Sequence, residues 1–327
     1  MLQLGIIGCG RVTSMFHLKA IKQLENINVL AVADVNENRM NEIKKSGGAS
    51  FGYLDYRQLL EAGDVEAVVI NTPPIFHEDM VLDALEAGKH VLCEKPLSTS
   101  IEGCLRVKDL KNKSGLVVLP LHNYAFTPSL TQMKNYIQAN SVGNICKIEV
   151  IFENLLKSYR SHTEFRENTK EGIVDDVLPH ILSVVYPLVG HVERVGFVNY
   201  WCKEYDVCDN LEAELFANND FLINSAMSWT KIRPRFSVRV DGEKGNLYTD
   251  LMINPYKLDI TIQGKTTTWK DKGVRWYLDM IQFKHPSFKK QYEHFYHLVK
   301  EGGDPMITVE DEINMIETKA KILEKMS

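Results

Sequence analysis

Cysteine is scarce in this sequence, and its spacing argues against a metal centre. The six cysteines form no Cys-x-x-Cys pair and no cluster with histidine at the spacing of a zinc site. We therefore expect buried or half-buried free thiols, as in proteins of the reducing cytosol, and no bound metal. The cysteines are Cys9, Cys93, Cys104, Cys146, Cys202 and Cys208.

Long apolar runs and blocks of one charge sign are also absent. No apolar run reaches the roughly 18 residues of a membrane span, and Met1 leads directly into a strand pattern, which leaves no room for a signal peptide. The formal net charge is −5 and both signs are mixed along the chain, so nothing points to nucleic acid or to an anionic membrane surface. We expect a soluble, cytoplasmic protein.

Internal repeats, low-complexity tracts and Pro/Gly/Ser-rich linkers are missing as well. A length of 327 residues favours two domains. Up to about Leu121 short apolar runs alternate with helical patterns, as a doubly wound parallel α/β sheet requires. We predict a nucleotide-binding domain of this kind over residues 1–121 and a second domain over residues 122–327.

The first motif joins an apolar strand pattern to a glycine turn. The run Leu2–Ile7 enters Gly8-Cys9-Gly10, and a helical pattern follows over Met15–Ile21. This order is typical of the first βαβ unit of a dinucleotide-binding fold. Gly8 would form the tight turn, and Gly10 would let a pyrophosphate approach the backbone at the helix N-terminus.

The residues after the turn extend this candidate cofactor site. Arg11 and Val12 open the helix, and Thr13 replaces a third glycine that mainly serves helix–strand packing. The strand pattern Ile27–Ala33 ends in Asp34, about 20 residues beyond the turn, where a carboxylate can bind a ribose hydroxyl. Its charge would repel a 2′-phosphate, so we expect NAD rather than NADP. The alternative is a purely structural turn and a solvated acid.

Another strand pattern delivers polar residues to the carboxyl edge of the predicted sheet. Val65–Ile70 stops at Asn71-Thr72-Pro73-Pro74, where the prolines forbid further strand pairing. Since ligands bind at this edge in open α/β sheets, we predict that Thr72, Pro73 and His77 line the cofactor cleft. For His77, a surface position in the following helix is the alternative.

The next strand pattern, Lys89–Cys93, ends in Glu94-Lys95-Pro96. Pro96 lacks a backbone donor and stiffens the chain, which holds Lys95 in a defined direction. A partly buried lysine beside a positively charged nicotinamide loses its proton more readily and can exchange it with a substrate hydroxyl. We predict that Lys95 is catalytic and that Glu94 belongs to the same site; a solvated lysine is the alternative.

In their order and spacing, these motifs resemble those of the glucose-fructose oxidoreductase/inositol dehydrogenase/MocA (Gfo/Idh/MocA) family. The resemblance implies an N-terminal Rossmann domain and a C-terminal α/β domain with a large, mostly antiparallel open sheet. It also implies an NAD(P)-dependent oxidoreductase of sugars, cyclitols or related compounds, with Lys95 as its active-site lysine. The matching segments are Gly8-Cys9-Gly10-Arg11, Asp34, Asn71-Thr72-Pro73 and Glu94-Lys95-Pro96.

The segment Leu121–Phe126 resembles the crossover segment of the family, in which an arginine commonly precedes the final aromatic residue. Ala125 takes that place, so any contact made by the arginine is missing. Asn123 matches a position often near the nicotinamide, and the resemblance implies that it contacts cofactor and substrate. Thr127 and Pro128 predict the N-cap and first residue of a helix.

Asp176 and His180 mark a second candidate centre. They are four residues apart, so a helix would place them on one face. Pro179 fits only in a first helical turn, which predicts a helix that starts near Val177 with Asp176 as its N-cap. Near a helix N-terminus a histidine stays neutral and can accept a proton. The alternative is a capping aspartate and a core histidine.

The Asp-x-x-x-His spacing resembles the second active-site motif of the same family, which favours the catalytic interpretation. The match is incomplete, because family members usually carry two or three glycines where this chain has Gly172, and a small residue where it has Pro179. The polar stretch Ser158–Gly172 is the candidate for a mobile loop. Arg166 within it would bind a substrate hydroxyl or carboxylate, or would be solvated.

Strand patterns linked by hairpin turns fill the chain from Val192 to about Lys270 and predict a broad sheet. One face would pack on helices, and the other, if apolar, would form a dimer surface, as in the family that the chain resembles. Two helices follow, over Tyr277–Lys300 with a break at His285-Pro286 and over Val309–Lys325. We expect a homodimer or homotetramer.

Together these features predict an NAD-dependent oxidoreductase that moves a hydride between nicotinamide C4 and a carbinol carbon of a polyhydroxylated substrate. Lys95 and His180 would share proton transfer, and Asp176 would orient the histidine or hold a hydroxyl. Two alternatives stay open: a non-catalytic NAD-binding sensor of the same fold, and an enzyme without net redox that uses a transient hydride shuttle. Substrate contacts are predicted for Lys95, Asn123, Arg166, Asp176 and His180.

Overall fold

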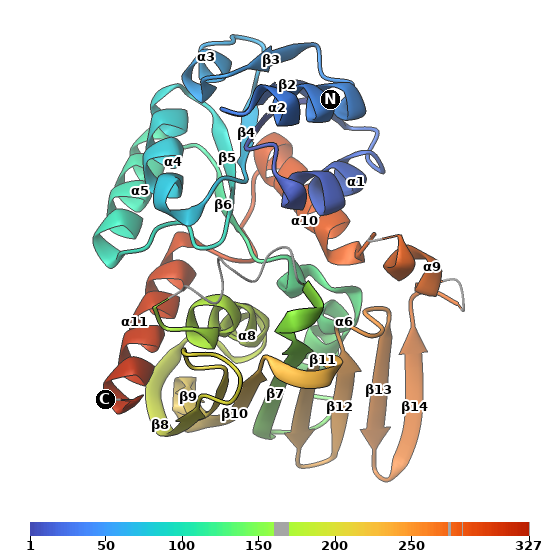
Figure 1. Cartoon of the computed structure of the whole chain (residues 1–327). Coiled ribbons are helices and arrows are strands. Elements are labelled where there is room, and N and C mark those ends of the chain that lie inside the picture. The colour runs from blue at the N-terminus through green and yellow to red at the C-terminus, as the bar shows by residue number, and fades with distance from the viewer. Residues whose placement is uncertain (160–169, 274–275, 283, 327) are drawn as a thin grey trace. The chain divides into compact units, whose positions relative to one another are not determined.

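The computed structural model describes residues 1–159, 170–273, 276–282 and 284–326 (Figure 1). The chain divides into two compact units. Residues Met1–Asn123 and Leu278–Ile313 form unit 1, and residues Tyr124–Tyr277 and Asn314–Ser327 form unit 2. The predicted two-domain division assigned everything after residue 121 to the second domain, whereas unit 1 also takes in a C-terminal segment of the chain.

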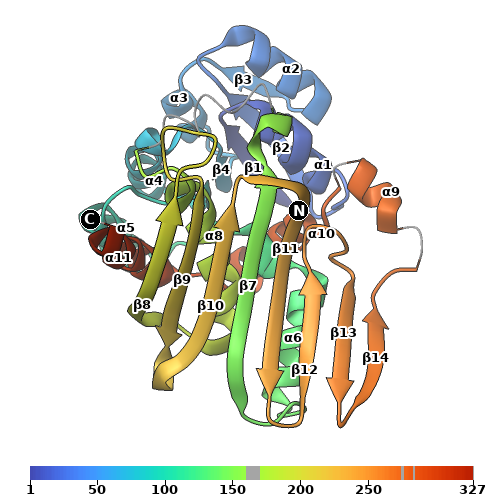
Figure 2. The same cartoon turned by 60° about the horizontal axis from the view of Figure 1, so that its bottom comes forward.

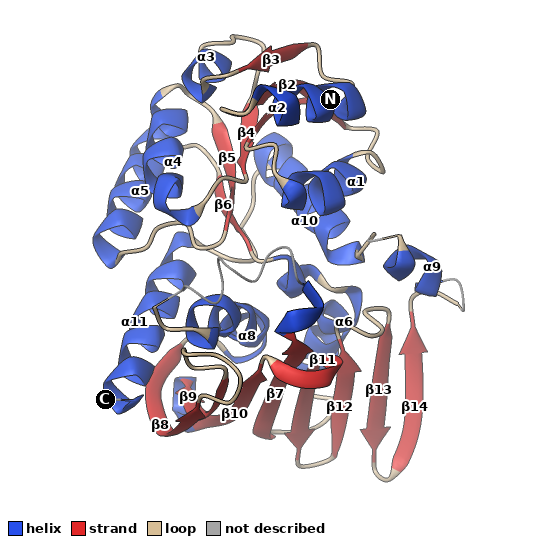
Figure 3. Cartoon of the chain, in the orientation of Figure 1, coloured by secondary structure: helices blue, strands red, loops and turns tan. Residues whose placement is uncertain are grey.

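Unit 1 is built on a six-stranded sheet with the order β3-β2-β1-β4-β5-β6, in which every strand pairing is parallel (Figure 3). Strands β1 and β4 are buried along almost their whole length, as expected when helices cover both faces of a parallel sheet. The doubly wound sheet predicted from the sequence is therefore confirmed. The strands are β1 (Leu2–Ile7), β2 (Ile27–Ala33), β3 (Phe51–Tyr53), β4 (Ala67–Ile70), β5 (His90–Glu94) and β6 (Val118–Leu121).

The strand order of unit 1 reverses between β1 and β4. In open α/β sheets ligands bind outside the carboxyl ends of the strands at such a point. The order thus directs attention to the residues that follow β1, β2, β4 and β5. The helices of the N-terminal part are η1 (Thr13–His17), α1 (Leu18–Ile21), α2 (Glu37–Gly47), α3 (Tyr56–Leu60), η2 (Pro74–Phe76), α4 (His77–Glu86), α5 (Ile101–Ser114) and η3 (Asn123–Phe126).

Helix α10 (Pro286–Glu301) belongs to unit 1 because of its packing. Its Tyr292 and Phe295 are fully buried and lie in the same apolar core as the side chains of β1 and β2. The predicted break at His285-Pro286 is confirmed: Pro286 is the first residue of α10, and the His285 side chain accepts a hydrogen bond from the Ser287 backbone nitrogen. The remaining C-terminal helices are α9 (Trp276–Ile281) and α11 (Val309–Met326).

Unit 2 is built on an eight-stranded sheet with the order β14-β13-β12-β11-β7-β10-β9-β8 (Figure 2). Only the β7–β10 pairing is parallel among the described pairs, so the predicted mostly antiparallel sheet is confirmed. The strands are β7 (Ile145–Leu155), β8 (Val192–Trp201), β9 (Asn210–Ala217), β10 (Phe221–Ser228), β11 (Thr230–Gly242), β12 (Gly245–Asp250), β13 (Lys257–Ile262) and β14 (Lys265–Lys270).

One face of this sheet is covered by helices (Figure 1). The alternation along β7 shows the division: Ile148 and Val150 are fully buried, whereas the intervening Glu149 points to the other face and is half-buried. Apolar residues of α8 (Ile173–Val189) and of α11 beyond its first turn complete the core of unit 2. The other helical segments of the unit are α6 (Pro128–Gln138), which has the predicted Thr127 N-cap, η4 (Leu156–Tyr159) and η5 (Asn218–Asp220).

All six cysteines are free. Cys9, Cys93, Cys104 and Cys208 are buried, as predicted. The prediction was wrong for Cys146 and Cys202, which are exposed because they lie near the start of β7 and just after β8, outside the packed core. Among the described helices, none combines the length and the apolar character that crossing a membrane demands.

Candidate functional site

The glycine turn after β1 has the shape that the sequence predicts. Gly8 has a φ of +93°, and a Cβ at this position would lie 2.8 Å from the backbone carbonyl carbon and oxygen of Asn71. Only glycine permits this approach between the ends of β1 and β4. No atom lies within 4 Å of a Cβ placed on Gly10, so its backbone borders open space, as the approach of a pyrophosphate requires.

Thr13 ties the following helix to the turn. It is fully buried, its hydroxyl donates to the Gly8 carbonyl at 2.7 Å, and the Asn71 side-chain nitrogen donates to that hydroxyl at 3.1 Å. Thr13 therefore links the ends of β1 and β4, a task that a third glycine could not perform. The helix is π-helical over Thr13–His17, a form often found at functional sites.

Asp34 follows β2 and contacts the glycine turn directly. Its Oδ2 accepts a hydrogen bond from the Cys9 backbone nitrogen at 2.7 Å, and its Oδ1 accepts one from the Asn36 nitrogen at 2.8 Å. A carboxylate offers about four acceptor sites, so these bonds leave capacity for ribose hydroxyls. Burial, and then the charge of Asp34, raise the pKa of Cys9 to about 12, which makes this thiol a neutral neighbour of the turn.

Exposed apolar side chains lie beside these polar groups, and the sequence analysis missed most of them. Val35 is 91% exposed directly after Asp34, and Ile75 is 74% exposed after the two prolines that follow β4. Phe76 and Val12 are also exposed. Ligand pockets are lined mainly by apolar groups, so these residues are candidates for contact with the flat rings of a nucleotide. The sequence feature that could have identified Val35 is an isolated apolar residue just after a strand.

Thr72 and Pro73 follow β4 at the same edge, where Thr72 is half-buried and Pro73 is exposed. His77, the first residue of α4, is fully buried, so the surface alternative for this residue was wrong. Its Nε2 lies 2.7 Å from the Thr72 carbonyl oxygen and its Nδ1 lies 2.7 Å from the Pro96 carbonyl oxygen. His77 thus connects the segments that follow β4 and β5.

Lys95 leaves β5 at this edge and is half-buried. The preceding Glu94 accepts hydrogen bonds from the Lys95 backbone nitrogen at 3.2 Å and from His17 Nε2 at 3.1 Å. Burial raises the pKa of Glu94, but the hydrogen bond from His17 and its charge, with the charge of Lys95, outweigh burial, and the pKa is lowered. Glu94 is therefore an anion beside the lysine. The Lys95–Pro96 peptide bond is cis.

Asn123 is the last residue of the first segment of unit 1 and is half-buried, and its side-chain nitrogen donates to the Ser287 hydroxyl at 2.9 Å. This bond anchors it to the first turn of α10. Ala125 is only 2% exposed, so the residue that stands where the family that the chain resembles commonly has an arginine fills a packed position. Arg166 and most of the stretch predicted to be a mobile loop lie outside the described residues.

Helix α8 starts earlier than predicted. It spans Ile173–Val189 with Gly172 as its N-cap, so the predicted start near Val177 with Asp176 as N-cap was wrong. The Ile173 nitrogen donates to the Cys208 carbonyl at 2.8 Å, which means that a distant backbone segment caps the helix. Pro179 lies inside the helix, where it removes one helical hydrogen bond.

This start changes the argument about His180. Asp176 lies in the first turn of α8, but His180 lies beyond it, where the helix dipole has little effect. The dipole therefore no longer explains a neutral histidine. His180 is half-buried, packs edge-on against Tyr124 with ring centroids 5.3 Å apart, and stacks on Phe152 at 6.1 Å. These aromatic contacts, all within unit 2, set the orientation of its ring.

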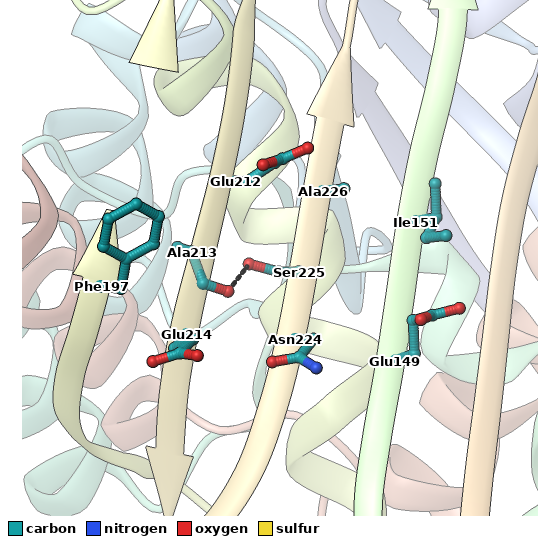
Figure 4. Close-up of a pocket in the computed structure, with 9 residues that line it drawn as sticks. All are labelled: Glu149, Ile151, Phe197, Glu212, Ala213, Glu214, Asn224, Ser225 and Ala226. Carbon is teal, nitrogen blue, oxygen red and sulfur yellow. Dashed lines mark hydrogen bonds between the residues drawn. The ribbon is translucent and has the colours of Figure 1, made fainter. Parts of the chain in front are cut away.

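The open face of the sheet in unit 2 carries a hollow, shown in Figure 4. The prediction of a dimer surface depended on an apolar face, and this part of the face is instead rich in carboxylates. Strands β7, β8, β9 and β10 contribute Glu149, Ile151, Phe197, Glu212, Ala213, Glu214, Asn224, Ser225 and Ala226.

Sequence profiles of one family match both parts of the chain. Residues 2–122 match the profile described as the oxidoreductase family, NAD-binding Rossmann fold. Residues 130–248 match the Gfo/Idh/MocA C-terminal domain. The two profiles together span most of the sequence. The first match lies within unit 1 and the second lies within unit 2.

Two curated proteins match shorter parts of the chain. The glucose-6-phosphate 3-dehydrogenase of Bacillus subtilis (strain 168) is 31% identical over 193 residues, a match that covers 58% of this chain and 54% of that protein. The myo-inositol 2-dehydrogenase of Thermotoga maritima is 28% identical over 142 residues, which cover 43% of this chain and 42% of that protein. The chain thus spans about half the length of these curated relatives in the matched regions.

A solved structure matches nearly the whole chain. An oxidoreductase from Agrobacterium radiobacter, in complex with NAD+, L-tartaric acid and magnesium, has a TM-score of 0.86 at 17% identity. The match covers 99% of this chain and 96% of that one. At this identity the likeness establishes the fold and leaves the chemistry to the residues of the site.

Proposed function

Because this chain belongs to the Gfo/Idh/MocA family, we propose that it is an NAD-dependent oxidoreductase. It would transfer a hydride between nicotinamide C4 and a carbinol carbon of a sugar, a cyclitol or a related polyhydroxylated compound. One observation carries the proposal: Gly10, Asp34 and Lys95 follow three strands of one parallel sheet, at the edge where such sheets bind ligands.

The residues at this edge fit a dinucleotide. The open backbone at Gly10 and the helix start at Arg11 and Val12 would receive the pyrophosphate, and Gly8 gives the turn its shape. Asp34 would bind the adenosine ribose, and its charge would disfavour a 2′-phosphate. The other residues assigned to the cofactor are Thr72, Pro73, His77, Glu94, Lys95 and Asn123, with His77 and Glu94 acting mainly on the backbone around them.

The bound cofactor would supply the hydride acceptor or donor. In the oxidation, the C–H bond breaks and a C=O bond forms while a side chain removes the hydroxyl proton; in the reduction, the same side chain returns it. We assign this proton transfer to Lys95 and His180. Lys95 is half-buried beside the anionic Glu94, and His180 has a ring that aromatic neighbours hold in place.

Asp176 would orient His180 or hold a neighbouring substrate hydroxyl, since both residues lie on α8 and both are half-buried. Asn123 and Arg166 are assigned to the substrate as well. We further propose a cytoplasmic location, in line with the free thiols, and a homodimer or homotetramer formed through the sheet of unit 2. Given the carboxylates on its open face, such an interface would depend on charge pairing.

The test is a direct assay of hydride transfer. The purified protein is mixed with NAD or NADP and a panel of polyols that includes glucose 6-phosphate and myo-inositol, and both NADH fluorescence and products are followed. We expect NAD reduction with at least one compound, and a loss of about 10²-fold or more in the rate of Lys95→Ala. Near-normal turnover by this variant would refute the role of Lys95.

The same assay separates the alternatives. Tight binding of NAD with no reaction across the panel would favour the sensor. Product formation without accumulation of NADH would favour a transient hydride shuttle.

A further inference from the structure

Ionisable side chains bind the backbone of three consecutive residues around Lys95. The Lys95 nitrogen donates to Glu94 at 3.2 Å, the Pro96 carbonyl lies 2.7 Å from His77 Nδ1, and the Leu97 nitrogen donates to Glu312 Oε2 at 3.0 Å. Glu94 is the neighbour of Lys95 on β5, but His77 opens α4 and Glu312 lies in the first turn of α11. All of these residues belong to unit 1.

His77 makes a pair of contacts that a neutral ring cannot satisfy. Both ring nitrogens lie 2.7 Å from carbonyl oxygens, those of Thr72 and Pro96, and a carbonyl oxygen only accepts hydrogen bonds. A neutral imidazole has one N–H group, whereas an imidazolium has two. Because His77 is fully buried, water cannot take the place of the missing donor.

Carboxylates are present to balance a buried imidazolium. Burial raises the pKa of Glu312, but its partners outweigh burial, and the pKa is lowered. These partners are His122, through its charge and a hydrogen bond, the Leu97 backbone nitrogen, through a hydrogen bond, and His77, through its charge. The charge of His77 also acts on Glu94. On its own helix, His77 is followed by Glu78, which is already paired with Arg106.

Glu312 holds the segment from another side. It is 1% exposed, and its second oxygen is hydrogen-bonded to the fully buried His122 at the end of β6. Breaking one partner of a buried ionic contact leaves an uncompensated charge and is costly. The position of Glu312, and with it the Leu97 nitrogen, is thus closely defined.

We propose that His77, as an imidazolium, and Glu312, as a carboxylate, are positioning residues that set the direction in which Lys95 leaves β5. They act through the peptide groups of Pro96 and Leu97 and need not touch substrate or cofactor. The inference rests on the proposed function, in which the Lys95 amine transfers the proton. A misplacement of a catalytic group by about 1 Å can cost on the order of 10²-fold in rate.

The kinetic test compares two variants with two matched controls. Glu312→Gln and His77→Gln remove the charges. In the controls, Glu66→Gln alters a carboxylate that accepts from the Gln3 nitrogen at 2.9 Å, and His90→Gln alters a histidine whose Nδ1 accepts from the Val117 nitrogen at 3.0 Å. Both control contacts lie away from Lys95, at the beginning of strands.

We expect kcat to fall by roughly 10²-fold in each test variant, while the control variants keep their kcat. In Glu312→Gln, whose side chain is assigned no cofactor contact, KM and the Kd of NAD should change by less than about threefold. Equal kcat values in test and control variants would overturn the inference. So would losses in the test variants that appear only in KM or in the Kd of NAD.

Two spectroscopic readouts do not require turnover. In protein labelled with 15N-histidine, the His77 signals, identified by their loss in His77→Gln, should show protons on both ring nitrogens at neutral pH; a nitrogen with a free lone pair would contradict the imidazolium. After reductive 13C-methylation, the Lys95 signal, identified with Lys95→Ala, should shift in Glu312→Gln but not in Glu66→Gln. An unchanged signal would contradict the positioning role.

The NMR measurements test the positioning role of His77 and Glu312 separately from the proposed oxidoreductase function. If no substrate is turned over, or if Lys95→Ala is fully active, the proposed function fails while the NMR signals still decide whether His77 and Glu312 position the lysine. If His77→Gln does not fold, His77→Asn identifies the 15N signals in its place, and the Lys95 signal of Glu312→Gln still decides the positioning role.

Discussion

The Asp34 carboxylate accepts a hydrogen bond from the backbone nitrogen of Cys9 at 2.7 Å. The acid predicted to choose the cofactor therefore also supports the turn that would receive the pyrophosphate. The two tasks can be separated in part, because asparagine removes the charge and keeps one acceptor oxygen, which can serve the Cys9 nitrogen or the Asn36 nitrogen but not both.

We predict that Asp34→Asn relaxes the discrimination against NADP. The affinity ratio of NAD to NADP should fall by about tenfold or more, since a like-charge repulsion is removed. Asp34→Asn should lower the melting temperature through the loss of one backbone hydrogen bond, and Asp34→Ala should lower it further, because both bonds are lost. Calorimetric titration with both cofactors measures the ratio, and Asp55→Asn, at the N-cap of α3, is the control. An unchanged ratio in Asp34→Asn would remove Asp34 from cofactor selection.

Gly172 is another position where the backbone requires glycine. Its φ is +58°, and an added Cβ would lie 2.2 Å from the Cys208 carbonyl oxygen, the same oxygen that caps α8. Gly264 is a matched control, since its φ is +77° but no atom lies within 4 Å of its Cβ position. Gly264→Ala should cost about 1–2 kcal/mol, the left-handed penalty alone.

Gly172→Ala should cost clearly more than that, because the start of α8 must also move. Urea unfolding of the two variants measures the difference. Equal losses of unfolding free energy would mean that the contact with Cys208 does not constrain the helix.

The sheet of unit 1 could be predicted because its signals are local. Apolar runs such as Ile27–Ala33 end at residues that stop a strand, and this strand was predicted with the bounds that the structure shows. The start of α8 could not be predicted, since its cap is the Cys208 carbonyl, supplied by a segment far along the chain. Pro179 then suggested a later start, because an isolated helix would not hold a proline in its interior.

The candidate site was predicted only in part, and for a related reason. The strand patterns predict Asp34 and Lys95 directly, because each residue follows the end of a strand. The contacts of His77 with the carbonyls of Thr72 and Pro96 depend instead on how the ends of β4 and β5 are placed side by side. No periodicity marks a histidine as fully buried. Val35 does not stand out in the sequence, because an exposed apolar residue after a strand carries no polar motif, although nucleotide sites also need apolar contacts.

Acid should destabilise the protein through Glu94 and Glu312. Burial raises the pKa of each, but His17 and His122, respectively, outweigh it, so both folded-state pKa values are lowered. Such groups stabilise the folded state above the unfolded carboxyl pKa of about 4.3, and this contribution is lost as the pH falls through the lower folded value.

The free energy of unfolding should therefore decrease as the pH is lowered below about 4.3. The decrease should be steeper in the wild type than in Glu312→Gln. Urea unfolding at a series of pH values measures both slopes. Identical slopes would show that Glu312 titrates alike in the folded and unfolded states.

The last prediction concerns Thr13, which donates to the Gly8 carbonyl and accepts from the Asn71 side chain. Thr13→Val has nearly the same shape but leaves two buried polar groups without their partner, which should cost about 1–3 kcal/mol. Thr13→Ser retains the hydroxyl and should cost less. Because the hydroxyl joins the glycine turn to the end of β4, Thr13→Val should also weaken NAD binding, whereas Thr13→Ser should not. Urea unfolding and calorimetric titration with NAD measure the two effects. Losses confined to Thr13→Ser would show that packing of the methyl group, rather than the hydroxyl, holds the turn.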